Sequence, residues 1–347
     1  MKIDLIASDG SPMGITPPDI EGRGVGGAEL AMMTLMRTFA ERGHNVRVFN
    51  NPRAPGRYDG VTYHRHEDFQ LAEPRDVIIL FRAPSPMVDS RAPCRVMWWS
   101  CDQYTVGDYK ALSNSVNNVI CISDHHRNYF LEHYQMDKNK IAVFDLGVRL
   151  ADYNFIEEKV KNRLIFCSVP DRGLEQLLPA YKIIKEMVPD ATLTITSDYR
   201  LWGAAPMNER HRLAWAGQPG VTFYGMVPRR ELIRLQTQAE ILAYPCTYDE
   251  LFCIAIAECQ VAGALPVTSA YGALPATNSA GIVIPGQPDS GDFTRAFASR
   301  ISGLLTTDRQ YMKSHVKKMQ EAARRRFDWS IVAQKWERLI KEGKADA

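Results

Sequence analysis

Residues 241–268 read ILAYPCTYDELFCIAIAECQVAGALPVT. An apolar run of strand length comes first, then a polar loop, an apolar run of helix length and a second strand-like run. This pattern predicts a strand at 241–244, a helix at 254–262 and a strand at 265–268. Two strands joined through a helix lie parallel, so the stretch indicates a doubly wound α/β sheet.

The same alternation continues on both sides of this stretch and restarts once. Near residues 148–162 the chain turns polar and irregular, and a fresh alternation begins after it. The predicted strands are 3–7, 46–50, 77–81, 96–100, 119–122 and 142–146 before the restart, and 164–168, 192–196 and 221–224 after it. The predicted helices are 28–42 and 125–133 before it, and 174–187 and 230–239 after it.

The length of 347 residues suits two domains of this kind. We expect one Rossmann-like domain at 1–150, a second at 151–325, and a C-terminal helix at 326–347 that packs back on the first domain. In doubly wound sheets, ligands bind where the carboxyl ends of the strands face a crevice. A cleft between the two domains is therefore the expected active site.

Composition excludes several classes of protein. The net charge of +2 lacks the basic excess of a nucleic-acid binder, so no nucleic-acid partner is expected. The start MKIDLIASDG has no apolar stretch of signal-peptide length, and no run reaches the length of a membrane-spanning helix. The seven cysteines form no C-x-x-C pair, which favours a reducing cytoplasm and no zinc site. Membrane-surface association through Arg324–Arg326 is a weaker alternative to a solvated helix end.

Two glutamates mark the loop and helix of the opening stretch. Glu250 lies in the loop after the strand 241–244, and Glu258 lies about one turn into the following helix. Carboxylates accept hydrogen bonds from paired hydroxyl groups, so the two could bind a sugar and a ribose. The helix is apolar nearly all round, so we expect Glu258 to be buried and to have polar partners.

Two glycine-containing loops follow strands at equivalent places in the two halves. Gly26 and Gly27 precede the helix 28–42, where close backbone approach and a helix N-terminus favour a phosphate. Arg172 precedes Gly173 at the turn after the strand 164–168, where a cation and a helix start converge. Each loop by itself is also compatible with a flexible turn or a capping loop.

Taken together and in order, these motifs resemble the retaining nucleotide-sugar glycosyltransferases of family 4, which have the GT-B fold. The resemblance spans nearly the whole chain. It is carried by the E-x7-E pattern of Glu250 and Glu258 with Phe252 between them, by Gly26-Gly27, by Arg172-Gly173, by 221–225 and by 272–275.

The resemblance implies a role for each matched residue. Glu250 is the expected catalytic carboxylate beside the donor sugar, and Glu258 is expected to hold the ribose hydroxyls. Cys101 and Asp102 stand where the family often has His-Asp, and they complete the catalytic set. The donor-binding residues implied are Gly26, Gly27, Ser168, Arg172, Gly225, Met226, Phe252, Cys253, Ile254 and Glu258. No metal and no cofactor are expected, because cations and amides neutralise the diphosphate.

The implied activity is transfer of a hexose-type sugar, with retention, from a nucleoside-diphosphate sugar to an acceptor hydroxyl. Residues 151–325 would bind the nucleotide-sugar, and residues 1–150 would form the acceptor side. The acceptor is a glycan, a lipid-linked molecule or a small molecule, and carbohydrate biosynthesis in the cytoplasm is the implied setting. The sequence leaves the nucleotide, the sugar and the oligomeric state open.

Three departures from the family pattern keep alternatives open. Cys101 replaces the usual histidine, and Cys253 replaces the usual glycine after Phe252. Where the family often has an arginine followed some residues later by a lysine, this chain has only Arg172. A catalytically weak or inactive sugar-nucleotide-binding protein is one alternative. Another GT-B enzyme, such as a sugar-nucleotide epimerase, is a second. A phosphorylase would need a pyridoxal-phosphate lysine, and residues 250–258 contain none.

Overall fold

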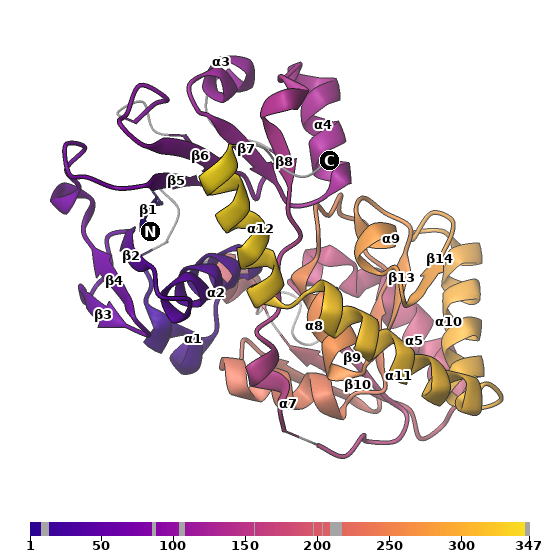
Figure 1. The fold of residues 1–347 in the computed structure, drawn as a ribbon. Coiled ribbons are helices and arrows are strands. Elements are labelled where there is room, and N and C mark those ends of the chain that lie inside the picture. The colour runs from indigo at the N-terminus through magenta and orange to yellow at the C-terminus, as the bar shows by residue number, and fades with distance from the viewer. Residues whose placement is uncertain are drawn as a thin grey trace. The chain divides into compact units, whose positions relative to one another are not determined.

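The computed structural model describes residues 1–7, 14–84, 88–103, 108–155, 157–196, 198–202, 204–208 and 217–343. The chain folds as two compact units (Figure 1). Unit 1 consists of Met1–Ile20, Gly27–Gly147 and Trp329–Ala347, and unit 2 of Glu21–Gly26 and Val148–Asp328. The boundaries expected at 150/151 and 325/326 thus lie at 147/148 and 328/329. Nothing in the sequence indicates that Glu21–Gly26 belongs with unit 2.

Unit 1 is built on an eight-stranded sheet in the order β3-β4-β2-β1-β5-β6-β7-β8. All neighbouring strands are parallel except β3 and β4. The strands are β1 (Lys2–Ile6), β2 (Asn45–Phe49), β3 (Gly56–Tyr58), β4 (Val61–His64), β5 (Val77–Phe81), β6 (Arg95–Trp99), β7 (Asn118–Cys121) and β8 (Ile141–Val143).

Helices flank this sheet, as a parallel sheet buried on both faces requires. They are α1 (Pro17–Arg23), which ends in unit 2, and α2 (Gly27–Glu41), α3 (Tyr109–Asn114), α4 (Asp124–Tyr134) and α12 (Trp329–Glu342). The last helix packs against α2 (Figure 1). The ring of its Trp336 lies 5.2 Å from the ring of Trp99 on β6. The C-terminal helix therefore forms part of the core of unit 1.

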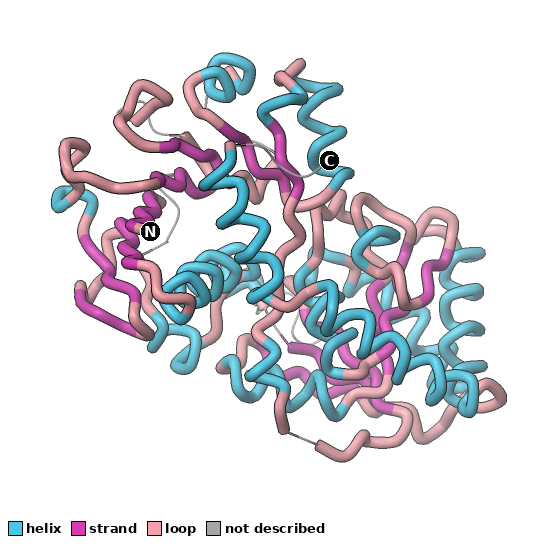
Figure 2. The backbone as a smooth tube through the Cα atoms, viewed as in Figure 1, coloured by secondary structure: helices cyan, strands magenta, loops and turns pink. Residues whose placement is uncertain are grey.

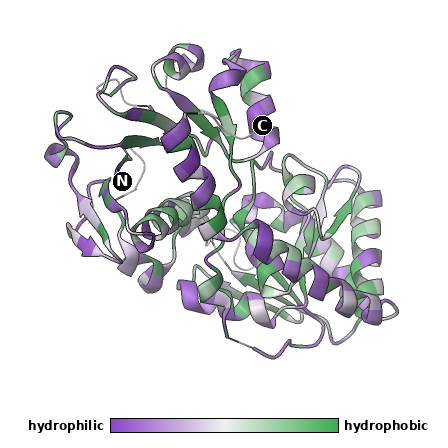
Figure 3. Cartoon of the chain, in the orientation of Figure 1, coloured by the Kyte–Doolittle hydropathy of each residue, from purple (hydrophilic) through white to green (hydrophobic). Residues whose placement is uncertain are grey.

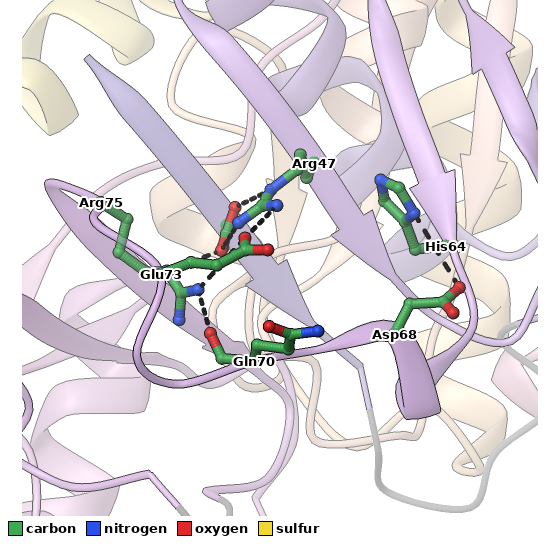
Figure 4. A network of polar contacts seen from close by, with 7 residues as sticks. Arg47, His64, Asp68, Gln70, Glu73 and Arg75 are labelled. Carbon is green, nitrogen blue, oxygen red and sulfur yellow. Dashed lines mark hydrogen bonds and ion pairs between the residues drawn. The ribbon is translucent and has the colours of Figure 1, made fainter.

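A charge network with a buried centre joins β1 and β2 of unit 1 (Figure 4). Asp4 on β1 is buried and accepts two hydrogen bonds from Arg47 on β2, at 2.9 and 2.8 Å. Arg75 lies 2.9 Å from the same carboxylate, and Glu73 pairs with Arg47. Two cations thus meet two carboxylates, which offsets the desolvation cost of burying Asp4.

Unit 2 is built on a six-stranded sheet in the order β11-β10-β9-β12-β13-β14. Every strand pair is parallel. This is the Rossmann order, because the chain leaves β9 toward one edge and returns on its other side with β12. The strands are β9 (Arg163–Cys167), β10 (Thr192–Thr196), β11 (Val221–Gly225), β12 (Ile241–Tyr244), β13 (Leu265–Ser269) and β14 (Ile282–Ile284).

Helices also cover the sheet of unit 2, and in each unit the strands form one inner layer (Figure 2). Helix α10 packs against α5, and α11 packs against α8. The strands are mostly hydrophobic, whereas α11 alternates hydrophobic and hydrophilic residues (Figure 3). The helices are α5 (Leu174–Met187), α7 (Arg229–Gln238), α8 (Ile254–Ala262), α9 (Leu274–Thr277), α10 (Gly291–Leu305) and α11 (Arg309–Arg326).

Apart from the C-terminal helix, the strands and helices predicted from the sequence appear in the structure with ends shifted by at most three residues. The C-terminal helix, expected at 326–347, spans Trp329–Glu342, and residues 344–347 lie outside the described part of the chain. The strands β3, β4 and β14 were missed, because each is only three or four residues long. Along the part of the chain that the structure describes, no helix combines the length and the apolar character needed to cross a membrane.

Candidate donor site

The carboxyl ends of β9 and β12 form the switch point of unit 2. From β9 the chain runs outward to β10 and β11, and it then returns to the opposite side of β9 with β12. Loops that follow two such strands diverge, so a crevice opens between them where ligands bind. Ser168 and Arg172 follow β9, and Glu250 follows β12.

The Glu250 carboxylate is held by a hydrogen bond from Tyr244 at this switch point. The Tyr244 hydroxyl donates a hydrogen bond of 2.8 Å to Glu250 Oε1, and it lies 3.3 Å from Ser168 Oγ. Burial raises the pKa of Tyr244, and Glu250 adds to the shift, so the phenol keeps its proton and stays a donor. Glu250 is therefore fixed in place but keeps 15% of its side chain exposed.

Arg172 supplies a cation beside this carboxylate. Its Nη1 atom lies 3.4 Å from Glu250 Oε1, and its guanidinium carbon lies 3.2 Å from the ring centroid of Tyr248. Burial acts to lower the pKa of Arg172, but Glu250 and the nearby tyrosines outweigh it and raise the pKa. The guanidinium thus stays charged, and the sequence-predicted pair of Arg172 and Glu250 meets in space.

Gly173 lets β9 and β12 approach each other this closely. Its φ of 111° is disfavoured for other residues, and a Cβ atom there would lie 2.4 Å from the carbonyl oxygen of Pro245. A side chain at 173 would therefore push the Arg172 turn away from the loop that carries Glu250.

The loop at 272–275 is tied to the backbone of Glu250. Ala273 N donates a hydrogen bond of 2.7 Å to the Glu250 carbonyl oxygen. Gly272 has a φ of 56°, and a Cβ atom there would lie 2.6 Å from that same oxygen. The loop 272–275, one of the segments that carry the family resemblance, thus fixes the backbone of the predicted catalytic residue Glu250.

Helix α8 begins beside Glu250, at Ile254, and Phe252 and Cys253 lead into it. Phe252 is buried and its ring contacts Phe327 edge-on at 5.8 Å, so it packs in the core of unit 2. Cys253 provides no side-chain cap for the helix. The Cys253 side chain therefore does not cap the first amides of α8 as an acceptor, and helix N-termini favour anions.

Cys253 has a φ of 69°, a left-handed conformation that costs other residues about 1 kcal/mol relative to glycine. We expect Cys253→Gly to be more stable to urea than Cys253→Ala by about 1 kcal/mol, since alanine keeps the strained Cβ. Urea unfolding of the two variants measures the difference. An alanine variant as stable as the glycine variant would contradict this backbone conformation.

Glu258 lies apart from Glu250, in the interior of unit 2. Its Oε1 atom lies 2.6 Å from Arg229 Nη1, and its Oε2 atom accepts a 2.9 Å hydrogen bond from Gln236. The burial and the polar partners expected for this carboxylate are thus present. In this structure its partners are protein groups from α7, and its role toward a ribose stays a prediction.

Gly225 and Met226 end the strand β11. The Met226 amide donates a 3.1 Å hydrogen bond to Asp198, which pairs with Arg200 at 2.6 Å. Burial tends to raise the pKa of Asp198, but the bonds from Arg200 and Met226 lower it overall. Asp198 therefore stays ionised and fixes the loop of Gly225 and Met226, two of the donor-binding residues that the resemblance implies.

The predicted glycine loop divides between the two units. Gly26 belongs to unit 2, whereas Gly27 begins α2 in unit 1. Gly24, two residues earlier, has a φ of 75°, and a Cβ atom there would lie 2.4 Å from the Val227 carbonyl oxygen. The close approach that the glycines allow is thus seen at Gly24, a residue that sequence reasoning did not select.

Cys101 and Asp102 follow β6 at the carboxyl edge of the unit 1 sheet. Asp102 accepts a 2.7 Å hydrogen bond from Arg82 Nε, and Arg82 Nη1 lies 3.4 Å from Glu29. Burial raises the pKa of the Cys101 thiol well above its usual value, and Asp102 adds to this. A thiol that keeps its proton is a poor base and nucleophile, so Cys101 cannot replace an imidazole in that role.

Arg82, Tyr244, Asp198 and Arg229 are the polar residues that sequence reasoning missed. Tyr244 could have been selected, because it ends a strand beside the switch point. Arg229 opens a helix of polar composition, where arginine is usually solvated. Among the described residues no group of three metal-ligating side chains occurs. The segments 11–23 and 102–113, which lie within the expected acceptor side at 1–150, fall partly outside the described residues.

Comparisons with known proteins address the fold and the family. The solved structure of sucrose-phosphate synthase from Thermosynechococcus elongatus matches with a TM-score of 0.72 and 16% identity, over 99% of this chain and 98% of that one. Anabaena HepE in complex with UDP and glucose matches with a TM-score of 0.69 and 17% identity, over 98% and 99% of the two chains.

Sequence comparison matches parts of the chain. A subunit of phosphatidylinositol N-acetylglucosaminyltransferase from Arabidopsis thaliana is 30% identical over 131 residues, which are 38% of this chain and only 27% of that relative. The family described as glycosyl transferases group 1 matches residues 155–326, which make up nearly all of unit 2. These residues are thus similar to the glycosyl transferases of group 1, and the two Rossmann-like units of the chain have the GT-B fold.

Proposed function

We propose that this protein is a retaining glycosyltransferase of family 4 that moves a hexose-type sugar from a nucleoside-diphosphate sugar to an acceptor hydroxyl. The observation that carries the proposal is the pairing of Arg172 with Glu250 at the switch point of unit 2. The pair places a cation for the leaving diphosphate beside a carboxylate for the positive charge that develops on the sugar. The group 1 family match and the UDP-glucose complex of the structurally similar HepE support the same donor class.

The residues of unit 2 divide the work in this proposal. Arg172 and the first amides of α8 neutralise the leaving diphosphate, as a metal would elsewhere, so the reaction proceeds without metal. Glu250, oriented by Tyr244, stabilises the positive charge on the sugar in the transition state. The neutral Cys101 takes no proton, so the diphosphate itself is the base for the acceptor hydroxyl. Asp102 and Arg82 contribute to the acceptor side.

A panel of nucleoside diphosphates tests the proposal. Thermal unfolding is measured with UDP, GDP and ADP, each with and without an attached hexose. We expect one base to raise the melting temperature by several degrees, because a ligand at a hundred times its Kd adds about 2.7 kcal/mol. Slow release of free sugar from the matching donor, with the α or β configuration kept, tests retention. Equal melting temperatures with every nucleotide would refute the proposal.

A further inference from the structure

Tyr248 covers one face of the Arg172 guanidinium at the candidate donor site. The guanidinium carbon lies 3.2 Å from the centroid of the Tyr248 ring, so the guanidinium rests on the face of the ring. Tyr248 is 42% exposed, whereas the Arg172 side chain is 20% exposed. The ring is therefore the more exposed group, and it covers guanidinium surface that water would otherwise reach.

A guanidinium that is covered on its face can still bind an anion through its edge. The five N–H donors of arginine lie in the plane of the group and form a fixed fork. Contact with an aromatic face uses none of these donors, but it limits the directions in which their plane can turn. Phosphate oxygens are bound best by such a fork, through two parallel hydrogen bonds. The Tyr248 ring thus orients Arg172 without competing for an anion.

The contact between Arg172 and Glu250 is longer than a closed ion pair. Arg172 Nη1 lies 3.4 Å from Glu250 Oε1, whereas charge-assisted hydrogen bonds between such groups are about 2.7–2.9 Å long. The same Oε1 atom accepts the 2.8 Å hydrogen bond from the Tyr244 hydroxyl. The guanidinium on the Tyr248 ring therefore stands beside the carboxylate without closing the short pair that would neutralise both groups.

The backbone of Tyr248 is anchored, so its ring is a fixed support. The Tyr248 amide donates a 3.3 Å hydrogen bond to the sulfur of the buried Cys246, and its carbonyl oxygen accepts one of 2.8 Å from the Glu250 amide. The Cys246 carbonyl oxygen accepts a 2.6 Å hydrogen bond from Ser269 Oγ on β13. Burial raises the pKa of the Cys246 thiol to about 12, so the sulfur stays neutral. One anchored turn thus carries both the ring and Glu250.

We propose that Tyr248 is a positioning residue, which orients the Arg172 guanidinium toward the terminal phosphate of the donor and keeps it from closing onto Glu250. The proposal rests on the function proposed above, because it requires a nucleoside-diphosphate donor. Glu250 is assigned there to the sugar, and the sugar is attached to the terminal phosphate, so the cation beside Glu250 faces that phosphate. Tyr248 acts through its ring face, and its hydroxyl is not needed.

The test compares UDP, GDP and ADP with UMP, GMP and AMP by calorimetric titration. For the base that binds, the wild-type protein is expected to bind the diphosphate about tenfold more tightly than the monophosphate, since a hydrogen bond to a charged group is worth at least that much. In Tyr248→Leu this ratio is expected to fall about fivefold, the effect of one cation–π contact at a partly exposed site. The affinity for the monophosphate is expected to stay at its wild-type value.

Tyr248→Phe keeps the ring face and is expected to keep the wild-type ratio. In an Arg172→Gln background, Tyr248→Leu is expected to lower the ratio no further, because the ring acts through the guanidinium. Tyr311→Leu is the matched control and should keep the wild-type ratio. Tyr311 lies on α11, is 49% exposed, and its ring centroid lies 5.8 Å from the guanidinium carbon of Arg300.

A wild-type ratio in folded Tyr248→Leu would overturn the positioning role. So would an equal fall of the ratio in Tyr248→Leu and Tyr248→Phe, or a loss of affinity for monophosphate and diphosphate alike. If Tyr248→Leu does not fold, Tyr248→Gln, which suits an exposed position, takes its place with the same expected ratio. A wild-type protein that binds none of the nucleotides would refute the proposed function instead.

Discussion

Replacing Glu250 by glutamine is expected to lower sugar transfer and donor hydrolysis by about 10²–10³-fold, with nucleotide affinity nearly unchanged. Glutamine keeps the shape of the side chain and can still accept the hydrogen bond from Tyr244, but it removes the negative charge. The negative charge stabilises the transition state, in which the sugar is positive, more than the bound substrate. We therefore expect kcat to fall much more than KM changes. Steady-state kinetics with the donor identified by the nucleotide panel measures both constants.

Glu186→Gln is the control for this experiment, since Glu186 is an exposed glutamate near the end of α5 in the same unit. It should leave both constants at their wild-type values. Unchanged hydrolysis in folded Glu250→Gln would show that Glu250 does not stabilise the transition state. The protein would then be better described as a sugar-nucleotide-binding member of its fold.

Replacing Gly173 by alanine is expected to destabilise unit 2 by about 3 kcal/mol, the sum of backbone strain and overpacking. The added Cβ would lie 2.4 Å from the Pro245 carbonyl oxygen and 2.9 Å from Cys246 Cα, and both atoms belong to rigid backbone. Relief would require β9 and β12 to separate at the switch point. Chemical unfolding monitored by tryptophan fluorescence measures the change, and donor affinity should fall with it.

Gly43→Ala separates the two causes. Gly43 has a φ of 85° after α2, but a Cβ atom there has no neighbour within 4 Å. This variant should therefore lose only the strain of the backbone conformation, about 1 kcal/mol. If Gly173→Ala were no more harmful than Gly43→Ala, the close approach of β9 and β12 would not constrain residue 173.

The alternation of short apolar runs was enough to predict both parallel sheets. The helices 174–187 and 254–262 and the strands 192–196 and 241–244 were predicted with the bounds that the structure has. In each of these segments the spacing of the apolar residues fits the period of its element, so burial and local pattern favour the same structure. The three-residue strand Gly56–Tyr58 offers no such pattern, because its pairing depends on β4, which the chain reaches only after a turn.

The candidate site was predictable where a residue type and a strand end coincide. Arg172 and Glu250 each follow a central strand, so parallel topology brings them together. The partners of Glu258 were not predictable, because Arg229 and Gln236 come from α7, a different segment of the chain. Nothing local distinguishes the buried Arg229 from the exposed Arg230 beside it. The pairing partners of a buried charge are a property of the packed fold.

The place of α12 in unit 1 has a consequence for the order in which the chain folds during synthesis. Unit 2 has all of its residues once Asp328 has been made, and its core can then form. Throughout the synthesis of unit 2, unit 1 still lacks Trp336, whose ring packs against the rings of Trp99 and Phe144. The apolar surface that α12 covers stays exposed until this last helix has been made. Unit 1, whose strands are translated first, therefore completes its fold last.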